Sequence, residues 1–401
     1  MSEWAYKKLD EYVRTGQIEL GRGNIISKLD IEACPGPYPI YSSSAQGDGK
    51  FGEYGKFMFD EELVSWSVDG GGNFFYRPKH QFSVTNVSGF LRIKTKELGY
   101  RFLYYSLALQ HRDISFDYTT KAHPSVIRKL YSIPSIPKHE QDRIVGVLST
   151  LDETIGQTEA LIVKYQQIKA GLMHDLFTRG VTPDGQLRPT REQAPHLYKE
   201  SPLGWIPKEW EIKRLVDMMI FPSGQVDPRD SPFSNWILIA PDHIEKETGR
   251  LLRIQTAGEQ GAISGKYTFQ SGDIVYSKIR PYLRKAILVD FSGLCSADMY
   301  PLRPANGVNA RYLLGVVLGD HFSKFAESVS MRSGFPKINR DEMSGYRCAV
   351  PSSSEQEVIA EILRSHDALL TTTEKQAVKL RQKKQGLMQD LLTGRVRVKA
   401  A

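Results

Sequence analysis

A basic and aromatic segment at residues 276–285 is the part of this chain best suited to hold a ligand. Lysine and arginine suit contact with phosphate, and arginine can also read guanine in the major groove of DNA. No acidic residue interrupts the segment, whose basic and aromatic residues are Tyr276, Lys278, Arg280, Tyr282, Arg284 and Lys285. This pattern favours DNA contact, and the alternative is a solvated basic strand and turn that binds nothing.

Polar loops elsewhere in the chain offer further candidates for DNA contact. One of them spans residues 332–339, where Asn339 could pair with two atoms of adenine. Its counterpart in the first half of the chain spans residues 119–123. The candidates in the polar loops are Ser43, Lys50, Asn73, Arg77, Lys79, Thr120, Lys121, His123, Arg332, Ser333, Lys337 and Asn339. For each of these loops, a solvated loop without a ligand is an equally good interpretation.

No arrangement of residues in the sequence indicates catalysis or metal binding. Residues 47–52 match G-x-G-x-x-G, but no βαβ unit surrounds them and no helix opens after them. The chain lacks a G-x-x-x-x-G-K-[ST] phosphate loop, and its 9 histidines are scattered without the spacing of metal ligands. Residues 67–69 lie beside glycines but lack the G-x-S-x-G motif of a nucleophilic serine. We therefore predict a chain that is not an enzyme and holds no cofactor or metal.

The composition is typical of a globular protein in a reducing compartment. Of the 401 residues, 40% are hydrophobic and 25% are charged, and the formal net charge of +7 weakly favours a polyanionic partner. Cys34, Cys295 and Cys348 have no CxxC spacing, which predicts neither a disulfide framework nor a zinc site. The N-terminal residues lack an apolar signal core, and no apolar run is long enough to span a bilayer. These features predict a cytoplasmic protein without a membrane partner.

Two copies of one helical segment would position the candidate loops. Residues 140–176 and 355–391 match without a gap at an offset of 215, and both copies end in G-L-M-x-D-L. Apolar residues recur at every third or fourth position in both copies, as along the contact stripe of a heptad helix. The residues predicted to pack helix against helix are Ile144, Leu148, Leu151, Ile155, Ile162, Leu172, Ile359, Leu363, Leu370, Leu380 and Leu387.

Each copy predicts one long helix, over about residues 138–178 and 354–392. A helix with a single apolar stripe needs a partner to cover that stripe, and the other copy can cover it in an antiparallel pair. Polar residues on the stripe, among them Thr158, Thr373 and His366, could define the register of the pair. The alternative is that both are core helices of one compact domain, although core helices are seldom this long.

A globular segment precedes each long helix, and the two segments open alike. Trp4–Leu9 and Trp210–Leu215 share W-x-x-basic-basic-L, and residues 334–338 parallel residues 122–126. Short β-like runs, for example at residues 73–76, and a helical run at residues 100–110 predict mixed α/β folds. The predicted fold class is α+β, with two mixed α/β domains separated by two long antiparallel coiled-coil helices in a pseudo-twofold tandem duplication. The predicted division is a domain at 1–137, a helix at 138–180, a linker at 181–204, a domain at 205–352, a helix at 353–395 and a tail at 396–401.

Further marks recur in a characteristic order along the chain. G-D-I-V-Y-S-K-I-R-P stands at residues 272–281, S-G-F-P stands at residues 333–336, and a proline followed by Glu-Gln opens each long helix. Together with the W-x-x-basic-basic-L openings and the G-L-M-x-D-L helix ends, these marks make the whole chain resemble the specificity subunit of type I restriction-modification systems. The first globular domain has no clear counterpart of the G-D-I-x-x-x-x-x-R-P block, and residues 61–66 are its nearest equivalent.

The resemblance implies a DNA-reading subunit with two target-recognition domains, residues 1–137 and 205–352, each for one half of a bipartite target. It implies that the helices set the spacing of the two halves and dock two methyltransferase subunits, which in turn hold the motor-nuclease subunits. Methylation and cleavage, with S-adenosylmethionine, ATP and Mg, would then belong to those partners. The alternative is a non-catalytic coiled-coil scaffold whose globular domains bind proteins.

Overall fold

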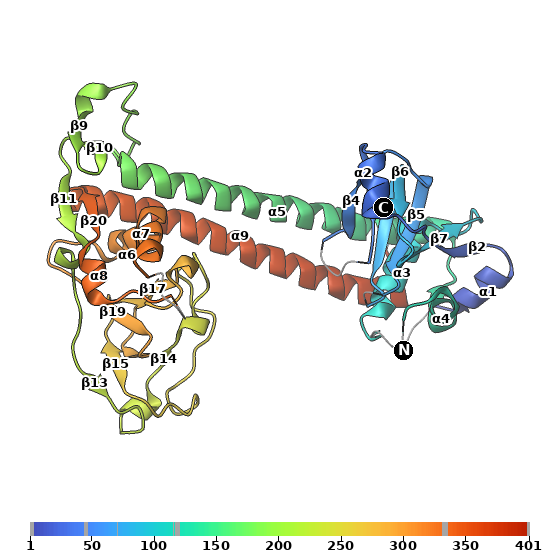
Figure 1. The fold of residues 1–401 in the computed structure, drawn as a ribbon. Helices are drawn as coiled ribbons and strands as arrows, with labels where there is room; N and C mark the ends of the chain where they lie inside the picture. The colour runs from blue at the N-terminus through green and yellow to red at the C-terminus, as the bar shows by residue number, and fades with distance from the viewer. Residues whose placement is uncertain are drawn as a thin grey trace. The chain divides into compact units, whose positions relative to one another are not determined.

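A computed structural model describes residues 4–43, 47–69, 71–114, 116, 121–330 and 336–398 of the chain. The chain divides into two compact units (Figure 1). Unit 1 comprises residues 1–160 and 374–401, and unit 2 comprises residues 161–373. Each unit therefore combines one globular part with one half of each long helix.

Both long helices predicted from the repeat are present. Helix α5 spans Lys138–Thr178 and helix α9 spans Ser353–Thr393 (Figure 1). Pro137 precedes α5 and Pro351 lies shortly before α9. A proline disfavours helical backbone in the residue before it, so neither helix extends back into the globular part that precedes it.

Each long helix is followed by a glycine that ends it. Gly180 has a φ of 63° and Gly394 has a φ of 78°, the left-handed conformation that commonly terminates a helix. Space requires glycine there as well. A Cβ atom would come within 2.5 Å of the Trp210 ring at Gly180 and within 2.8 Å of the Trp4 ring at Gly394. The opening tryptophan of each globular part therefore packs against the end of a long helix of the same unit.

Unit 1 is built on a six-stranded sheet with the strand order β2-β7-β5-β6-β3-β4. Helix α3 packs on this sheet, and β1 pairs with β8 in a small separate sheet. The predicted helix at residues 100–110 is confirmed as α3. The elements are β1 Tyr6–Lys8, α1 Leu9–Arg14, β2 Ile18–Arg22, α2 Lys28–Ala33, β3 Tyr38–Tyr41, β4 Lys50–Tyr54, β5 Phe59–Ser67, β6 Phe74–Val84, β7 Ser88–Ile93, α3 Tyr100–His111, α4 Pro124–Leu130 and β8 Ser132–Pro134.

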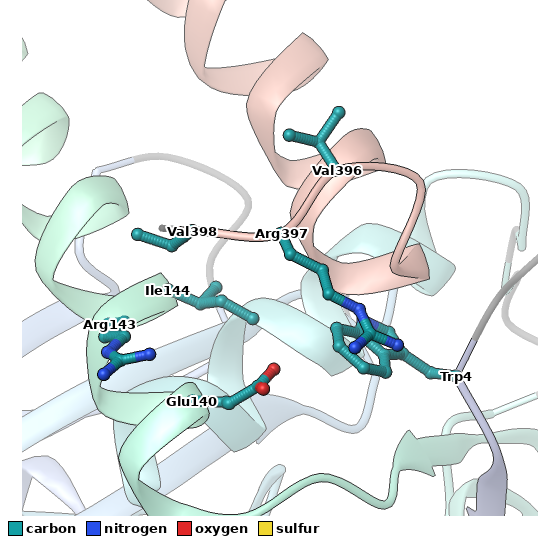
Figure 2. Close-up of a pocket in the computed structure, with 7 residues that line it drawn as sticks. All are labelled: Trp4, Glu140, Arg143, Ile144, Val396, Arg397 and Val398. Atoms are coloured by element: carbon teal, nitrogen blue, oxygen red, sulfur yellow. The ribbon is translucent and has the colours of Figure 1, made fainter. Parts of the chain in front are cut away.

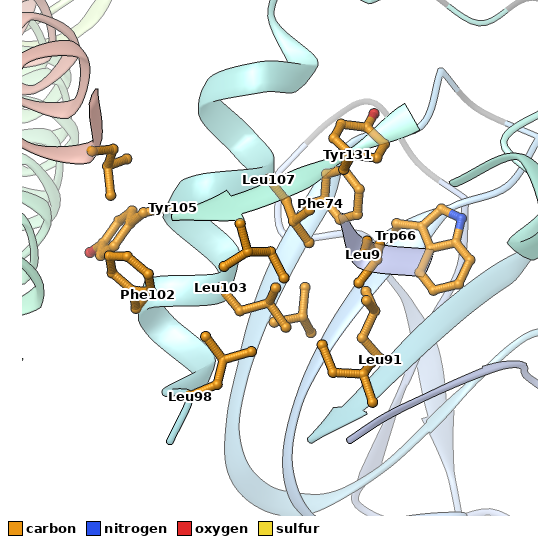
Figure 3. Packing of buried hydrophobic residues seen from close by; sticks show 14 of the residues in the cluster. Leu9, Trp66, Phe74, Leu91, Leu98, Phe102, Leu103, Tyr105, Leu107 and Tyr131 are labelled. Carbon is orange, nitrogen blue, oxygen red and sulfur yellow. The ribbon is translucent and has the colours of Figure 1, made fainter. Parts of the chain in front are cut away.

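The core of unit 1 lies between the sheet and α3. Figure 3 shows Leu103 and Leu107 of α3 together with Phe74, Leu91 and Trp66 of the sheet in one buried cluster. The cluster also contains residues from the first half of α5 and from the end of α9. Both long helices are therefore part of this core rather than appendages to it.

A bulge in this sheet lets β6 continue past Pro78, so β6 is longer than the strand predicted at residues 73–76. Leu63 pairs with Arg77 and Glu61 pairs with His80, so β6 has one more residue than β5 between these pairs. The extra residue accommodates Pro78, which lacks the N–H needed for regular pairing in a strand interior. The bulge comes immediately after Arg77 in β6, and the side chain of Arg77 is buried in unit 1.

Unit 2 contains two four-stranded sheets, β12-β19-β16-β17 and β13-β15-β18-β14, and the two-stranded pairs β9 with β10 and β11 with β20. Helix α6 and the second half of α5 contribute to its main core. The strands are β9 Tyr198–Ser201, β10 Gly204–Pro207, β11 Glu211–Arg214, β12 Met219–Ile220, β13 Gln225–Val226, β14 Leu238–Ile239, β15 Lys266–Phe269, β16 Ile274–Ser277, β17 Ala286–Leu288, β18 Gly293–Cys295, β19 Met299–Pro304 and β20 Arg347–Val350. The helices are α6 Ala310–Leu318, α7 Asp320–Ser330 and α8 Arg340–Ser344, with 3-10 turns at η1 Pro195–Leu197, η2 Leu215–Asp217, η3 Phe233–Asn235, η4 Pro241–His243 and η5 Pro281–Leu283.

The segment predicted to be a linker, residues 181–204, is ordered. Val181 pairs with Leu187 in an isolated bridge, and β9 lies within the segment. Arg188 forms an ion pair with Glu355 of α9, with 2.6 Å between Nη1 and Oε1. The prolines of this segment therefore shape a packed connection rather than a free tether.

The long helices pair through charged residues within each unit. In unit 1, Lys384 Nζ lies 2.5 Å from Asp152 Oδ1, and Arg381 Nη2 lies 2.5 Å from Glu159 Oε1. The acidic residue advances along α5 while its partner recedes along α9, so the two helix segments are antiparallel in this unit. In unit 2, the same type of contact joins Lys169 to Asp367 at 2.7 Å.

The residues predicted to pack helix against helix are all at least half-buried, and their contact across the helix pair stays a prediction. Six of them are buried, namely Ile144, Leu148, Ile155, Ile359, Leu363 and Leu370. The other five are half-buried, namely Leu151, Ile162, Leu172, Leu380 and Leu387. Within the described ranges, no helix combines the length and the hydropathy that crossing a membrane would require.

Two glutamines at corresponding positions of the repeat bind corresponding places in the two units. Gln141 Oε1 accepts from the backbone N–H of Gly99, the residue that caps α3, and Gln356 Oε1 accepts from that of Asn309, which caps α6. Each amide group also donates to a carbonyl just before its own helix, that of Ile136 at 3.0 Å and that of Pro351 at 3.1 Å. The two units therefore repeat the contacts between each long helix and its globular part as well as the helix sequences.

Candidate nucleic-acid interface

In unit 1, the loop after β5 and the loop before α4 are bound together. The N–H of Ala122 donates to the carbonyl of Val68 at 3.0 Å, and Trp66 Nε1 donates to the carbonyl of Ala122 at 2.7 Å. These bonds place the predicted residue Lys121 at the surface, where its side chain is 53% exposed and its Nζ lies 3.1 Å from Asp69 Oδ1. Lys121 is therefore a cation held in place by an acidic neighbour, and its ammonium still faces solvent.

Ser43 belongs to the same group of loops. Its Oγ donates to the carbonyl of Val87 and accepts a hydrogen bond from the N–H of Asp69 at 3.4 Å. Ser43, Asp69, Val87 and Lys121 are named the unit 1 loop cluster. His123, which follows it, caps α4 by accepting from Ser125 N. Thr120, also predicted, lies outside the described residues.

Arg77 is buried, which corrects its prediction as a DNA contact. The residue is 4% exposed, and its guanidinium carbon lies 3.6 Å from the centroid of the Tyr41 ring. Its Nε donates to Ser65 Oγ at 3.0 Å and its Nη2 donates to the carbonyl of Asp48 at 2.7 Å. Burial lowers the pKa of Arg77 to about 10, so it remains charged at neutral pH. Arg77 thus positions the loop of Asp48 and Lys50 and does not itself reach a ligand.

The other predicted residues of unit 1 are spread along the sheet. Lys50 is exposed on β4 and pairs with Glu53 at 2.8 Å, and Lys79 is exposed on β6. Asn73 is half-buried, and its carbonyl accepts from the N–H of Ser67 at 3.0 Å, which closes the turn between β5 and β6. Within the described ranges, no hydrogen bond or ion pair joins these three residues to the unit 1 loop cluster, so they are separate candidates.

In unit 2, the first residues of the basic and aromatic segment lie in the core. Tyr276 is 2% exposed, and its ring packs against that of Phe322 at 5.7 Å between centroids, so it is not available to DNA. Lys278 is also buried, with its Nζ 4.7 Å from the centroid of the Tyr300 ring. Burial is the main cause that lowers the pKa of Lys278, and the charges of neighbouring cations lower it further. The prediction fails for Tyr276 because β16 is an inner strand that is covered on both faces.

The remainder of the segment turns around η5. Arg280 and Arg284 flank η5 at φ values of 48° and 46°, in the left-handed region. Arg284 Nη2 donates to Asp320 Oδ1 at 2.5 Å, and Lys285 Nζ donates to the carbonyl of Pro241 at 2.8 Å. Tyr282 is exposed. The basic side chains of Arg284 and Lys285 are therefore engaged inside unit 2, whereas Arg280 and Tyr282 are exposed.

The loop at residues 336–339 lies against this turn. The N–H of Arg280 donates to the carbonyl of Pro336 at 2.8 Å, and the N–H of Ile338 donates to that of Lys278 at 2.9 Å. Lys337 is 49% exposed, with its Nζ 3.6 Å from Asp298 Oδ1. Asn339 caps α8 by accepting from the N–H of Glu342. Arg332 and Ser333, also predicted, lie outside the described residues.

The loop that carries Lys121 in unit 1 and the loop that carries Lys337 in unit 2 are held in the same way. Ala122 and Ile338 are both buried, and each N–H bonds to a carbonyl in the loop after a sheet strand. The residue before each is an exposed lysine beside an aspartate, and the residue after each caps a short helix. The equivalence therefore pairs Ala122 with Ile338, which corrects the alignment of residues 122–126 with 334–338 that the sequence suggested.

Arg340 is not among the residues that the sequence predicts, and it lies beside this loop. Its guanidinium is held over the rings of Phe221, Tyr267 and Tyr300, which come from three other segments of unit 2. No local signal could identify it, because the rings are far from Arg340 in the sequence. We name Lys278, Asp298, Lys337 and Arg340 the unit 2 loop cluster.

The cavities and side-chain groups of the described residues offer no metal site. No group of three or more His, Cys, Asp or Glu side chains among them could hold a metal ion. Figure 2 shows a narrow hollow of unit 1 in which Arg397 lies over the Trp4 ring at 4.7 Å, next to Glu140 and Ile144 of α5. A second cavity of about 270 Å³ lies between α3 and α5 in the same unit. Val396, Arg397 and Val398 form one side of the narrow hollow.

The chain is similar in sequence to known proteins. A family model described as the type I restriction modification DNA specificity domain matches residues 1–166 and 207–380. The chain is 29% identical over 385 residues to the specificity subunit of the type I restriction enzyme EcoDI from Escherichia coli, covering 90% of this chain and 82% of that one. It is 25% identical over 413 residues to the MjaVIII specificity subunit from Methanocaldococcus jannaschii, covering 97% of this chain and 93% of that one.

Solved structures are similar over nearly the whole chain. The S subunit of a type I restriction-modification system from M. genitalium is similar with a TM-score of 0.62 and 18% identity, covering 98% of this chain and 96% of that one. A chain from a structural study of type I R-M complex assembly and conformational transition is similar with a TM-score of 0.55 and 15% identity, covering 98% of both chains. At these identities, the similarity shows a shared fold.

Proposed function

Because the chain belongs to the family of type I restriction-modification DNA specificity proteins, we propose that it reads a bipartite DNA target, one half with each compact unit. The observation that carries this proposal is the equivalent pair of loops that present Lys121 and Lys337. An exposed lysine beside a single aspartate can exchange that partner for a phosphate, because duplex DNA presents a dense row of negative charges. The formal net charge of +7 supports the same partner.

The paired helices would set the distance between the two halves of the target. The ion pairs support a tandem duplication with pseudo-twofold symmetry, because Asp152 and Lys384 of unit 1 become Asp367 and Lys169 of unit 2 when both are shifted by 215. Such a pairing would use each charged contact twice, once at each end of an antiparallel coiled coil. Inserting residues into only one helix would break this correspondence.

The outer faces of the same helices would dock the catalytic partners. Val163 of α5 is 53% exposed and Val378 of α9 is 50% exposed, and they occupy corresponding positions of the repeat. Two equal apolar sites suit two copies of one partner, and we propose that these are two methyltransferase subunits, which in turn hold the motor-nuclease subunits. Methylation and cleavage, with S-adenosylmethionine, ATP and Mg, would then take place in those partners.

An exchange of the second globular domain tests the two-domain model. Residues 205–350 are replaced by the matching segment of another family member, and methylated sites are mapped in host genomes with the natural gene, the exchanged gene and no gene. We expect a bipartite motif that disappears without the gene and changes in one half only after the exchange. A motif that changes in both halves or in neither would contradict the division of the target between the units.

A further inference from the structure

Arg340, the first residue of α8, is half-buried against aromatic rings of unit 2. Its guanidinium carbon lies 4.8 Å from the centroid of the Phe221 ring, 5.3 Å from that of Tyr300 and 5.9 Å from that of Tyr267. Each ring attracts the cation through its quadrupole, and three rings together restrict the plane of the guanidinium. The orientation of Arg340 is therefore set before any ligand arrives.

The hydrogen-bond donors of Arg340 are open. Within the part of the chain that the structure describes, its guanidinium takes part in no hydrogen bond or ion pair, and none of its nitrogens is buried without a partner. Other arginines of unit 2 differ from it, since Arg284 donates to Asp320 and Arg303 donates to Asp273. A cation that is fixed in orientation and has open donors is suited to a ligand outside the chain.

The neighbours of Arg340 indicate what kind of ligand this is. Lys278 lies over the same Tyr300 ring, with its Nζ 4.7 Å from the centroid. The N–H of Ile338, the residue after Lys337, donates to the carbonyl of Lys278 at 2.9 Å, so Lys337 and Arg340 both lie beside the buried Lys278. Asp298, 3.6 Å from Lys337, is the acidic member of this cluster. Three cations around one carboxylate attract a polyanion.

We propose that Arg340 reads a guanine in the half of the target that unit 2 contacts, while Lys337 contacts a phosphate next to that base. This inference rests on the proposed function. The planar guanidinium presents paired donors that match O6 and N7 of guanine in the major groove. Lysine presents a point charge and does not reproduce this fork. Because the rings already hold the side chain, less conformational entropy is lost when the base is bound.

The test uses the full chain with its own methyltransferase subunits. Methylated sites are mapped in hosts that carry the natural protein, Arg340→Lys or the control Arg347→Lys. Arg347 is an exposed arginine on β20 of the same unit and lies outside the unit 2 loop cluster. Arg340→Lys is expected to lower the preference for guanine at one position of one half of the target roughly 5-fold to 150-fold and to leave the other positions unchanged. Arg347→Lys is expected to leave the whole motif unchanged.

A second variant covers the case in which Arg340→Lys does not fold. Glutamine pairs with N6 and N7 of adenine, so Arg340→Gln is expected to shift the preference at the same position from guanine towards adenine. A uniform loss of methylation at all sites by a folded variant would assign Arg340 to phosphate contact and overturn the proposal, as would an unchanged motif. If the natural protein itself yields no bipartite motif, the proposed function fails. A natural motif that the Arg340 variants leave intact rejects only the role of Arg340.

Discussion

The two units use the same residue types where a long helix meets the opening of a globular part, but they seal this junction differently. In unit 2, Glu355 accepts two bonds from Arg188, at 2.6 and 2.8 Å, one from Trp210 Nε1 at 3.2 Å and one from the N–H of Val181 at 2.9 Å. The side chains of Arg188 and Glu355 are both nearly buried. This junction is therefore closed around a buried ion pair.

In unit 1, the corresponding glutamate has a different environment. Trp4 Nε1 donates to the carbonyl of Leu391 at 3.0 Å, and Arg397 lies over the Trp4 ring. Glu140, at the repeat position of Glu355, lines the narrow hollow beside them (Figure 2). The closing arginine comes in both units from the segment after a long helix, and these two segments differ in sequence. The repeat thus specifies the helices, while the segments that follow them decide how each junction is sealed.

The largest predicted difference between the units is the effect of removing this glutamate. Glu355→Ala leaves the nearly buried Arg188 with only the exposed Glu209, 3.9 Å away, as an acidic partner. We expect this loss to destabilise unit 2 by about 3 kcal/mol. Glu140→Ala, the matched variant, is expected to destabilise unit 1 by less than about 1 kcal/mol. Hydrogen exchange measured by mass spectrometry reads the stability of each unit separately. Equal losses in the two units would show that their junctions do not differ in energy.

A smaller and equal effect is expected for the two glutamines that hold the globular parts. Gln141→Ala and Gln356→Ala each leave a half-buried N–H and a buried carbonyl without the glutamine partner, namely Gly99 and Ile136 in one unit and Asn309 and Pro351 in the other. We expect each change to destabilise its own unit by about 1–3 kcal/mol. Denaturant titration of both variants, followed by hydrogen exchange, checks the values. A loss in only one unit would limit the equivalence of the units to the helices.

The smallest predicted effect concerns the equivalent lysines of the loop clusters. Lys121→Glu and Lys337→Glu are each expected to weaken DNA binding for every sequence and to reduce the slope of log affinity against log salt by roughly 1. Lys199→Glu, at an exposed position of β9, serves as the control and is expected to leave the slope unchanged. Binding of the full assembly is measured over a range of salt concentrations. If only one of the two lysines changed the slope, only that unit would use this loop on DNA.

Elements with a local signal were predictable from the sequence. The period of three and four residues, the preceding prolines and the following glycines predicted α5 and α9 to within one residue at each end. The helix at residues 100–110 was predicted for the same reason, because helical periodicity is contained within a single segment. The offset of 215 also identified Gln141 and Gln356 as corresponding residues.

The sequence identified the lysines of both candidate loops but not their true correspondence. Lys121 and Lys337 were both predicted, yet the alignment by sequence was shifted relative to the backbone bonds of Ala122 and Ile338. Short loops carry few identities, so an alignment can slip by a residue or more without any visible penalty. Hydrogen bonds to the strand loops define the correspondence instead.

The sequence by itself determined the two long helices, their offset and the family, because periodicity and motifs are properties of neighbouring residues. The tertiary structure alone decided which candidate side chains reach the surface. Tyr276 is covered because the strands and helices of its sheet enclose β16, and Arg77 is turned inward beside a bulge in β6. Arg340 gains its role from rings that the fold brings together from three other segments. Burial and ring contacts depend on distant parts of the chain, so no pattern of adjacent residues could predict them.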